Sequence, residues 1–202
     1  MSLALLDYRR RVAAIYAAAR AAATPVEAHA VWCERRTALM ATHSQSADRS
    51  AVLRHAAYDE SWRAELPVHT DVAPQRIEIP TATDGVVPFD LIGVVTHPKV
   101  GELAVWWLGS YGGGVWLPLR DPSPETYGGG RYVLDSVKGA DLGGDIDPVT
   151  GRGTLVVDLN FAYNPSCAYD EAWACPLAPP GNVTDVAAPV GELLPVTADG
   201  AP

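Results

Sequence analysis

The stretch FDLIGVVTHPKVGELAVWWLG, residues 89–109, decides the fold class, because it reads as two apolar strands joined by a short turn. Valine, isoleucine, phenylalanine and tryptophan favour strands, and a connection this short favours an antiparallel hairpin. From about residue 75 onward the apolar pattern has a period of two, with Gly, Pro and Asp between the runs. The predicted strands are 75–79, 89–97, 102–109, 114–119, 131–138 and 154–162.

Upstream of these strands the sequence has a helical pattern. Apolar residues recur at spacings of three and four over residues 5–19, which indicates one apolar face of an amphipathic helix. TPVE, residues 24–27, combines a threonine cap, a proline in the first turn and a glutamate three residues after the cap. We therefore expect a second helix to about Met40, a polar loop at 42–50 and a short helix or turn over 51–66.

Two helices followed by six strands predict an α+β fold. We expect the N-terminal helices to pack on a mainly antiparallel, strongly bent sheet or a partly closed β-barrel. A chain of 202 residues is long enough for one buried core, so we predict a single domain, 1–202. Within it we expect a helical region at 1–66, a β-rich core at 67–182 and an extended tail at 183–202.

The composition excludes two classes of partner. The net charge is −9 and the lysines are Lys99 and Lys138, so the chain has no basic stripe for a nucleic acid or an anionic membrane. In the first 20 residues the arginines follow the short apolar stretch, whereas a secretory signal has them before it. No apolar run approaches the roughly 18 residues of a membrane span, so we expect a cytoplasmic protein.

The sequence YGGG occurs twice, at 111–114 and 127–130. A phosphate-binding loop needs a buried strand before its glycines and a helix after them. Here a β-patterned run follows each copy, so we do not assign phosphate binding to these loops. We interpret them as strand entries, where glycine lets the backbone bend or another group approach closely.

Polar residues gather on two of the predicted strands. Because side chains alternate along a strand, Arg131 and Asp135 share one face of theirs, and Asp158 and Asn160 share one face of the other. If the two strands pair, Arg131 lies near Asp158 or Asn160, and the four polar groups form a plausible ligand site. The alternative that the sequence leaves open is a solvated face with a weak cross-strand ion pair.

The stretch AYNPSCAYDEAWACPL, residues 162–177, carries two of the three cysteines, Cys167 and Cys175. Free thiols are the favoured interpretation, a disulfide comes second, and a metal site or catalytic thiol comes last, because structural zinc needs four closely spaced ligands. Tyr163 and Asn164 lie at the rim of the loop, beside the strand that carries Asp158.

The two stretches YGGGRYVLDSVKGADLG and FAYNPSCAYDEAWACPL resemble the motifs of a bacterial and archaeal family known as domain of unknown function 1684. Residues 125–143 and 155–182 match the family's pattern almost without gaps. The family has no assigned activity or cofactor, so the resemblance leaves both unknown. It does imply that the polar residues named here belong to a shared site or to a shared buried network.

Our first hypothesis is a small-molecule-binding protein, with a hydrolase as its enzymatic form. Arg131 and Lys138 hold an anionic group, Asp158 or Asp135 acts as acceptor or general base, and no metal is required. The predicted ligand-binding residues are Tyr127, Arg131, Lys138, Asn160, Tyr163 and Asn164.

The second hypothesis is a structural or protein-interaction module in which the same residues form a buried polar network. Three tryptophans then either pack in the core or form the face of a homodimer. At least one of two adjacent tryptophans belongs in the core, because neighbours on a strand point to opposite sides. The three are Trp106, Trp107 and Trp116.

Overall fold

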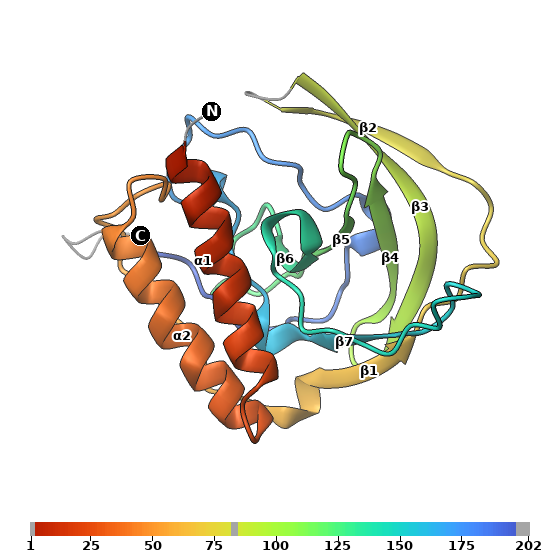
Figure 1. The fold of residues 1–202 in the computed structure, drawn as a ribbon, viewed down its shortest axis with the longest axis horizontal. Helices are drawn as coiled ribbons and strands as arrows, with labels where there is room; N and C mark the ends of the chain where they lie inside the picture. The colour runs from red at the N-terminus through yellow and green to blue at the C-terminus, as the bar shows by residue number, and fades with distance from the viewer. Residues whose placement is uncertain (1–2, 82–84, 197–202) are drawn as a thin grey trace.

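The computed structural model describes residues 3–81 and 85–196, and it has the predicted α+β fold. Helices α1 (Leu3–Arg20) and α2 (Pro25–Thr42) lie side by side and cover one side of a curved β-region, as Figure 1 shows. Thr24 caps α2, because its Oγ1 accepts a hydrogen bond from the backbone N–H of Glu27 (3.2 Å).

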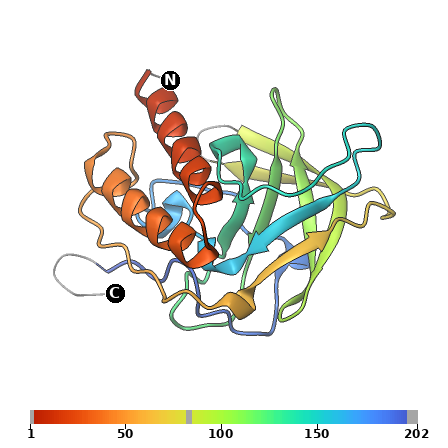
Figure 2. The same cartoon turned by 60° about the horizontal axis from the view of Figure 1, so that its bottom comes forward.

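The strands form two antiparallel sheets. Five strands pair in the order β2-β3-β4-β5-β6, and β1 pairs with β7 in a separate two-stranded sheet, which Figure 2 shows beside the larger one. The sheets curve around a common core without closing into a barrel. The strands are β1 (Arg63–Pro67), β2 (Arg76–Thr81), β3 (Gly85–His97), β4 (Gly101–Leu108), β5 (Val115–Leu119), β6 (Arg131–Asp135) and β7 (Thr154–Asp158).

The two sheets are joined by backbone hydrogen bonds at two places. After β1, His69 exchanges two hydrogen bonds with Val94 of β3 (2.9 and 3.0 Å), and after β7, Tyr163 does the same with Tyr132 of β6 (2.9 and 3.0 Å). The first junction requires a glycine in β3. A Cβ at Gly93 would lie 2.7 Å from the carbonyl oxygen of His69.

The structure corrects two predictions about the strands. The segment 51–66 contains a short 3-10 helix at Glu60–Trp62, but strand β1 begins directly after it, where no strand was expected. The predicted pairing of the strand at Arg131 with the strand at Asp158 is wrong. β6 pairs with β5 and β7 pairs with β1, so Asp158 lies opposite Arg63.

Two predicted strands are also shorter than expected, because an aspartate ends each of them. Asp135 caps a 3-10 turn by accepting from the backbone N–H of Lys138 (3.3 Å). Asp158 accepts from the backbone N–H of Asn160 (3.0 Å) in the same way. Side-chain caps of this kind compete with the ladder of a sheet, so each strand stops at its aspartate.

The core has one apolar cluster between the two sheets and a second between the helices and the large sheet. Trp106 is 2% exposed and its neighbour Trp107 is 40% exposed, which confirms that one of the two adjacent tryptophans is in the core. Much of the predicted tail is buried as well. Ala188, Val190 and Leu193 belong to the core, whereas 197–202 lie outside the described residues.

Asn182 connects this C-terminal segment to the large sheet. Its Oδ1 accepts from Nε1 of Trp106 (2.8 Å), and its Nδ2 donates to the carbonyl oxygens of Ala104 (2.8 Å) and Pro118 (3.0 Å). The side chain is fully buried. Removing it would leave the indole N–H and two carbonyl groups without partners in the core.

We therefore expect Asn182→Ala to lower the free energy of unfolding by about 3 kcal/mol, measured by urea denaturation. The exposed Gln45 offers the control, because Gln45→Ala is expected to change stability by less than about 0.5 kcal/mol. Equal stability of the two variants would contradict this role of Asn182.

Candidate functional site

Arg131 is fully buried, and both of its Nη atoms donate to acceptors, whereas its buried Nε has no hydrogen-bond partner among the described residues. Its Nη2 donates to Oδ2 of Asp121 (2.9 Å) and to the carbonyl oxygen of Ala188 (2.8 Å). Its Nη1 donates to the carbonyl oxygens of Val190 and Glu192. These contacts favour the second hypothesis for this residue, a buried polar network, and its role in ligand binding stays a prediction.

Asp121, the partner of Arg131, was not singled out in the sequence. Its carboxylate also accepts from the backbone N–H groups of Ser123 (3.0 Å) and Ala188 (3.1 Å), and from Oγ1 of Thr126 (3.2 Å). The pairing register of β5 and β6, had it been known, would have placed Asp121 near Arg131. Leu119 lies opposite Arg131, and Asp121 follows two residues later, on the same side.

Three further predicted site residues do come together. Asp135 accepts a hydrogen bond from the hydroxyl of Tyr163 (3.1 Å) and forms an ion pair with Nζ of Lys138 (3.2 Å). Lys138 Nζ also lies 5.0 Å from the ring centre of Tyr132. A small cavity of about 30 Å³ lies beside Lys138 and Tyr163, which is room for about a water molecule.

Asn164 and Glu192 belong to a second buried charge network. The fully buried Glu192 forms an ion pair with Arg36, whose Nε donates to it (2.9 Å) and whose Nη2 lies 2.8 Å away. It also accepts from the backbone N–H of Asn164 (3.1 Å) and from the hydroxyl of Tyr169. Burial raises the pKa of Glu192. Sequence analysis missed this glutamate, because its partner Arg36 lies on α2, 156 residues away.

Tyr127 lies apart from these groups, beside the cysteines. Its hydroxyl contacts Sγ of Cys167 at 3.6 Å, and burial raises the pKa of Tyr127 to about 12. Cys33, Cys167 and Cys175 are free thiols, each partly buried. Within residues 3–81 and 85–196, no group of three His, Cys, Asp or Glu side chains is placed to hold a metal ion.

Asp158 is the predicted site residue that lines a large pocket. Its Oδ1 accepts from the backbone N–H and Nδ2 of Asn160 (3.0 and 2.7 Å), and its Oδ2 accepts from the hydroxyl of Tyr58 (3.3 Å). The side-chain amide of Asn160 also bonds the backbone N–H and C=O of Asp59 (3.0 and 2.9 Å). Burial raises the pKa of Asp158, and the hydrogen bonds from Asn160 oppose that rise.

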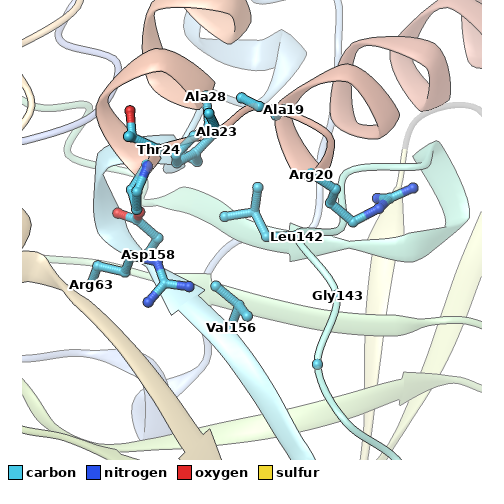
Figure 3. A pocket seen from close by; sticks show the side chains of 14 residues that line it. Ala19, Arg20, Ala23, Thr24, Ala28, Arg63, Leu142, Gly143, Val156 and Asp158 are labelled. Atoms are coloured by element: carbon cyan, nitrogen blue, oxygen red, sulfur yellow. The ribbon is translucent and has the colours of Figure 1, made fainter.

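The pocket lies where the turn between α1 and α2 faces β1 and β7, and its volume is about 470 Å³, within the range of small-molecule sites (Figure 3). Asp158 is 1% exposed, so its carboxylate meets the pocket only at its wall. The lining residues are Ala19, Arg20, Ala22, Ala23, Thr24, Pro25, Ala28, Arg63, Leu142, Gly143, Gly144, Val156, Asp158 and Phe161.

Two arginines that were not selected from the sequence also line this pocket. Arg63 is an exposed residue of β1, and Figure 3 shows its side chain reaching from the side of Asp158 toward Val156. Arg20, on the other side of Leu142 in that view, donates from Nη1 to the carbonyl oxygen of Asp141. Because strand β1 was not predicted, the sequence did not indicate on which face of a sheet Arg63 lies.

The wall opposite the helices comes from the segment at 142–144, whose position depends on a glycine. The backbone N–H of Val156 donates to the carbonyl oxygen of Gly143 (2.9 Å), which holds the segment along β7. A Cβ at Gly144 would lie 2.0 Å from the carbonyl oxygen of Thr154. Only glycine permits this approach, so Leu142 reaches the pocket.

Replacement of Arg131 tests the buried network. We expect Arg131→Met to lower the free energy of unfolding by about 3 to 5 kcal/mol, because Asp121 is left buried without a cation. In the matched control Arg76→Met, the lost ion pair with Asp90 is solvent-exposed, so the expected loss is below about 1 kcal/mol. Urea denaturation measures both, and wild-type stability of Arg131→Met would return this arginine to the list of ligand-binding candidates.

The pKa of Asp158 gives a second test. Tyr58→Phe removes the O–H donor to Oδ2, so we expect the pKa of Asp158 to rise further, measured by NMR titration of the carboxyl carbon. Asp147 is the internal control, because backbone N–H groups of Thr150 and Val149 lower its pKa and the substitution does not touch them. A pKa of Asp158 at or below its ordinary value in the wild type would contradict the assignment.

The raised pKa of Asp158 also makes the free energy of unfolding depend on pH. Because the folded-state pKa of Asp158 lies above the unfolded value of about 3.9, the folded protein binds more protons between the two values. The contribution of Asp158 to the free energy of unfolding therefore falls as the pH rises through that window.

Comparison with known proteins extends these observations. A solution NMR structure of an uncharacterised protein from Haloarcula marismortui is similar, with a TM-score of 0.52 and 24% sequence identity, covering 70% of this chain and 75% of that one. At this identity the likeness shows the fold alone. No curated protein matches the sequence.

The sequence profile of a family described as "Protein of unknown function (DUF1684)" matches residues 51–193. This range includes β1 to β7 and both sequence motifs, together with Asp121, Arg131, Asp158 and Glu192. The resemblance seen in the sequence is thus confirmed over most of its length, and the chain belongs to the DUF1684 family.

Proposed function

We propose that this protein binds a small molecule carrying an anionic group, in the pocket between the α1–α2 turn and the strands β1 and β7. The observation that carries the proposal is an open pocket of about 470 Å³ in which Arg63 stands beside the buried carboxylate of Asp158. A pocket of this size with few polar groups on apolar walls is typical of a small-molecule site.

The charges of the pocket favour an anion. Its charged lining residues are Arg20, Arg63 and Asp158, which leaves an excess of one positive charge. Arg63 is exposed, and its planar guanidinium matches a carboxylate or phosphate with two parallel hydrogen bonds. The anion-holding role first assigned to Arg131 and Lys138 is therefore proposed for Arg63, with Arg20 as the second cation.

Hydrolysis is the enzymatic form of this proposal, with Asp158 as the general base. A base works best when its pKa approaches the working pH, and burial moves the pKa of Asp158 in that direction. The hydrogen bonds from Asn160 and Tyr58 fix the carboxylate in one orientation. No particular scissile bond follows from this arrangement.

The buried Arg131–Asp121 pair supports a structural role for the motif residues outside the pocket. That role is compatible with ligand binding, because the network and the pocket use different side chains. Trp106 and Trp116 are core residues, which leaves the partly exposed Trp107 for a homodimer contact. We also propose a cytoplasmic location, supported by the three free thiols, and no nucleic-acid partner, supported by the net charge of −9.

Arg63→Gln tests the proposed function. In a thermal-shift screen with inorganic phosphate, phosphate monoesters, and mono- and dicarboxylates of two to six carbons, we expect at least one class of anion to stabilise the wild type. Arg63→Gln is expected to bind that anion at least about tenfold more weakly, because a charge-assisted pair is lost.

The control is Arg9→Gln, which removes the same charge from an exposed position of α1 outside the pocket lining. Both variants are expected to melt near the wild-type temperature without ligand. The proposal fails if no anion stabilises the wild type, or if the two variants bind the anion equally well.

A further inference from the structure

Arg63 and Asp158 are directly opposed residues of the β1–β7 pair, yet they do not form an ion pair with each other. Directly opposed side chains lie on the same face of a sheet, with Cβ atoms roughly 5 Å apart. Among the described residues, the ion pairs of arginines involve Arg11, Arg36, Arg76 and Arg131. An exposed cation and a buried anion thus stand next to each other at the pocket, close enough for the charge of Arg63 to lower the pKa of Asp158 but without an ion pair between them.

Asp158 has acceptor capacity left. Its Oδ1 takes two hydrogen bonds from Asn160, whereas its Oδ2 takes the hydroxyl of Tyr58 at 3.3 Å. A carboxylate oxygen can accept two hydrogen bonds, so Oδ2 can still accept a hydrogen bond from one more donor. A buried carboxylate without a cation is costly, and a donor that carries positive charge relieves that cost best.

Apart from Arg20, Thr24, Arg63 and Asp158, the residues that line the pocket are apolar or are glycines. The apolar lining includes four alanines, one in α1, two in the turn and one in α2, together with Leu142, Val156 and Phe161. Figure 3 shows Leu142 between the alanines and the segment at Gly143. These walls accommodate a hydrocarbon group and provide no second carboxylate.

Resting on the proposed function, we propose that the ligand is a small zwitterion with its ammonium and carboxylate on the same carbon atom, an α-amino acid with an apolar side chain. The carboxylate binds the guanidinium of Arg63, the ammonium donates to Oδ2 of Asp158, and the side chain lies along the alanines and Leu142. A simple anion leaves Asp158 without a cation in hydrogen-bond contact, and a dianion places a second negative charge beside it.

Three probes with one hydrocarbon body test the inference by titration calorimetry at pH 7. L-Phenylalanine carries both charged groups, 3-phenylpropanoate lacks the ammonium, and 2-phenylethylamine lacks the carboxylate. We expect L-phenylalanine to bind at least about tenfold more tightly than either analogue, because each analogue loses one charge-assisted hydrogen bond. L-Leucine, 4-methylpentanoate and 3-methylbutylamine repeat the comparison with an aliphatic body.

Two variants assign the two ends of the ligand. Asp158→Asn is expected to bind L-phenylalanine and 3-phenylpropanoate with equal affinity, and Arg63→Gln to bind L-phenylalanine and 2-phenylethylamine equally. Asp147→Asn is the matched control for the first variant, because Asp147 also accepts hydrogen bonds from backbone N–H groups but lies outside the pocket lining. This control is expected to keep the wild-type preference for the zwitterion.

A wild-type measurement keeps the inference testable if Asp158→Asn does not fold. The carboxyl NMR signal of Asp158 is expected to titrate at lower pH with saturating L-phenylalanine than with 3-phenylpropanoate, because an adjacent ammonium favours the ionised form. Equal titration in the two complexes would overturn the inference.

The outcomes separate the inference from the proposed function. If 3-phenylpropanoate or another anion binds as tightly as the amino acids and needs Arg63, the zwitterion inference is wrong and anion binding stands. If neither amino acid binds while an anion of the thermal-shift screen does, the zwitterion inference is again wrong and anion binding again stands. If neither the amino acids nor any anion binds, the proposed function fails together with the inference.

Discussion

The ion pair between Arg131 and Asp121 is the interaction on which the rest of the structure depends. Both side chains are buried, so each charge is tolerated only because the other is present and because neighbouring groups bond to both Nη atoms and to the carboxylate. Arg131 begins β6, Asp121 follows β5, and the remaining acceptors are carbonyl groups of the segment 188–192. One guanidinium thus fixes the path of a segment that has no regular secondary structure of its own.

The position of this segment determines where the helices lie. Once residues 188–192 are held by Arg131, Glu192 is buried beneath α2, where Arg36 neutralises it. Arg36 is therefore the point at which the helical layer is attached to the β-region by charge. The start of α2 forms one wall of the pocket, so the shape of the pocket follows from two ion pairs that do not line it.

The sequence was sufficient for features that depend on local periodicity and was insufficient for those that depend on long-range partners. The helix cap at Thr24 and the hairpin of β3 and β4 are local, and both were predicted. Strand β1 is only five residues long and pairs with residues 154–158, so nothing near it in the sequence indicated a strand. Because β1 was not predicted, the sheet face of Arg63 was unknown. Asp158 was therefore selected as a site residue without Arg63, which lies opposite it.

The aspartates show the same limit. Strand alternation selected Asp135 and Asp158 as candidate site residues, but it did not reveal that each ends its strand as a cap. Alternation describes the face of a residue within a ladder and does not say where the ladder stops. Asp121 lies 10 residues before Arg131 in the sequence, and the carbonyl partners of Arg131 lie about 60 residues after it. Only folding brings these groups into contact.

The dependence of Arg131 on residues 188–192 also has a consequence for the order in which the protein can fold during synthesis. The helices and most strands leave the ribosome well before this segment, yet the acceptors that satisfy the buried guanidinium are among the last described residues of the chain. Until they emerge, the nascent chain must keep Arg131 hydrated or expose an incomplete core. The final assembly of this α+β domain therefore waits until residues 188–192 have emerged, however early its hairpins form.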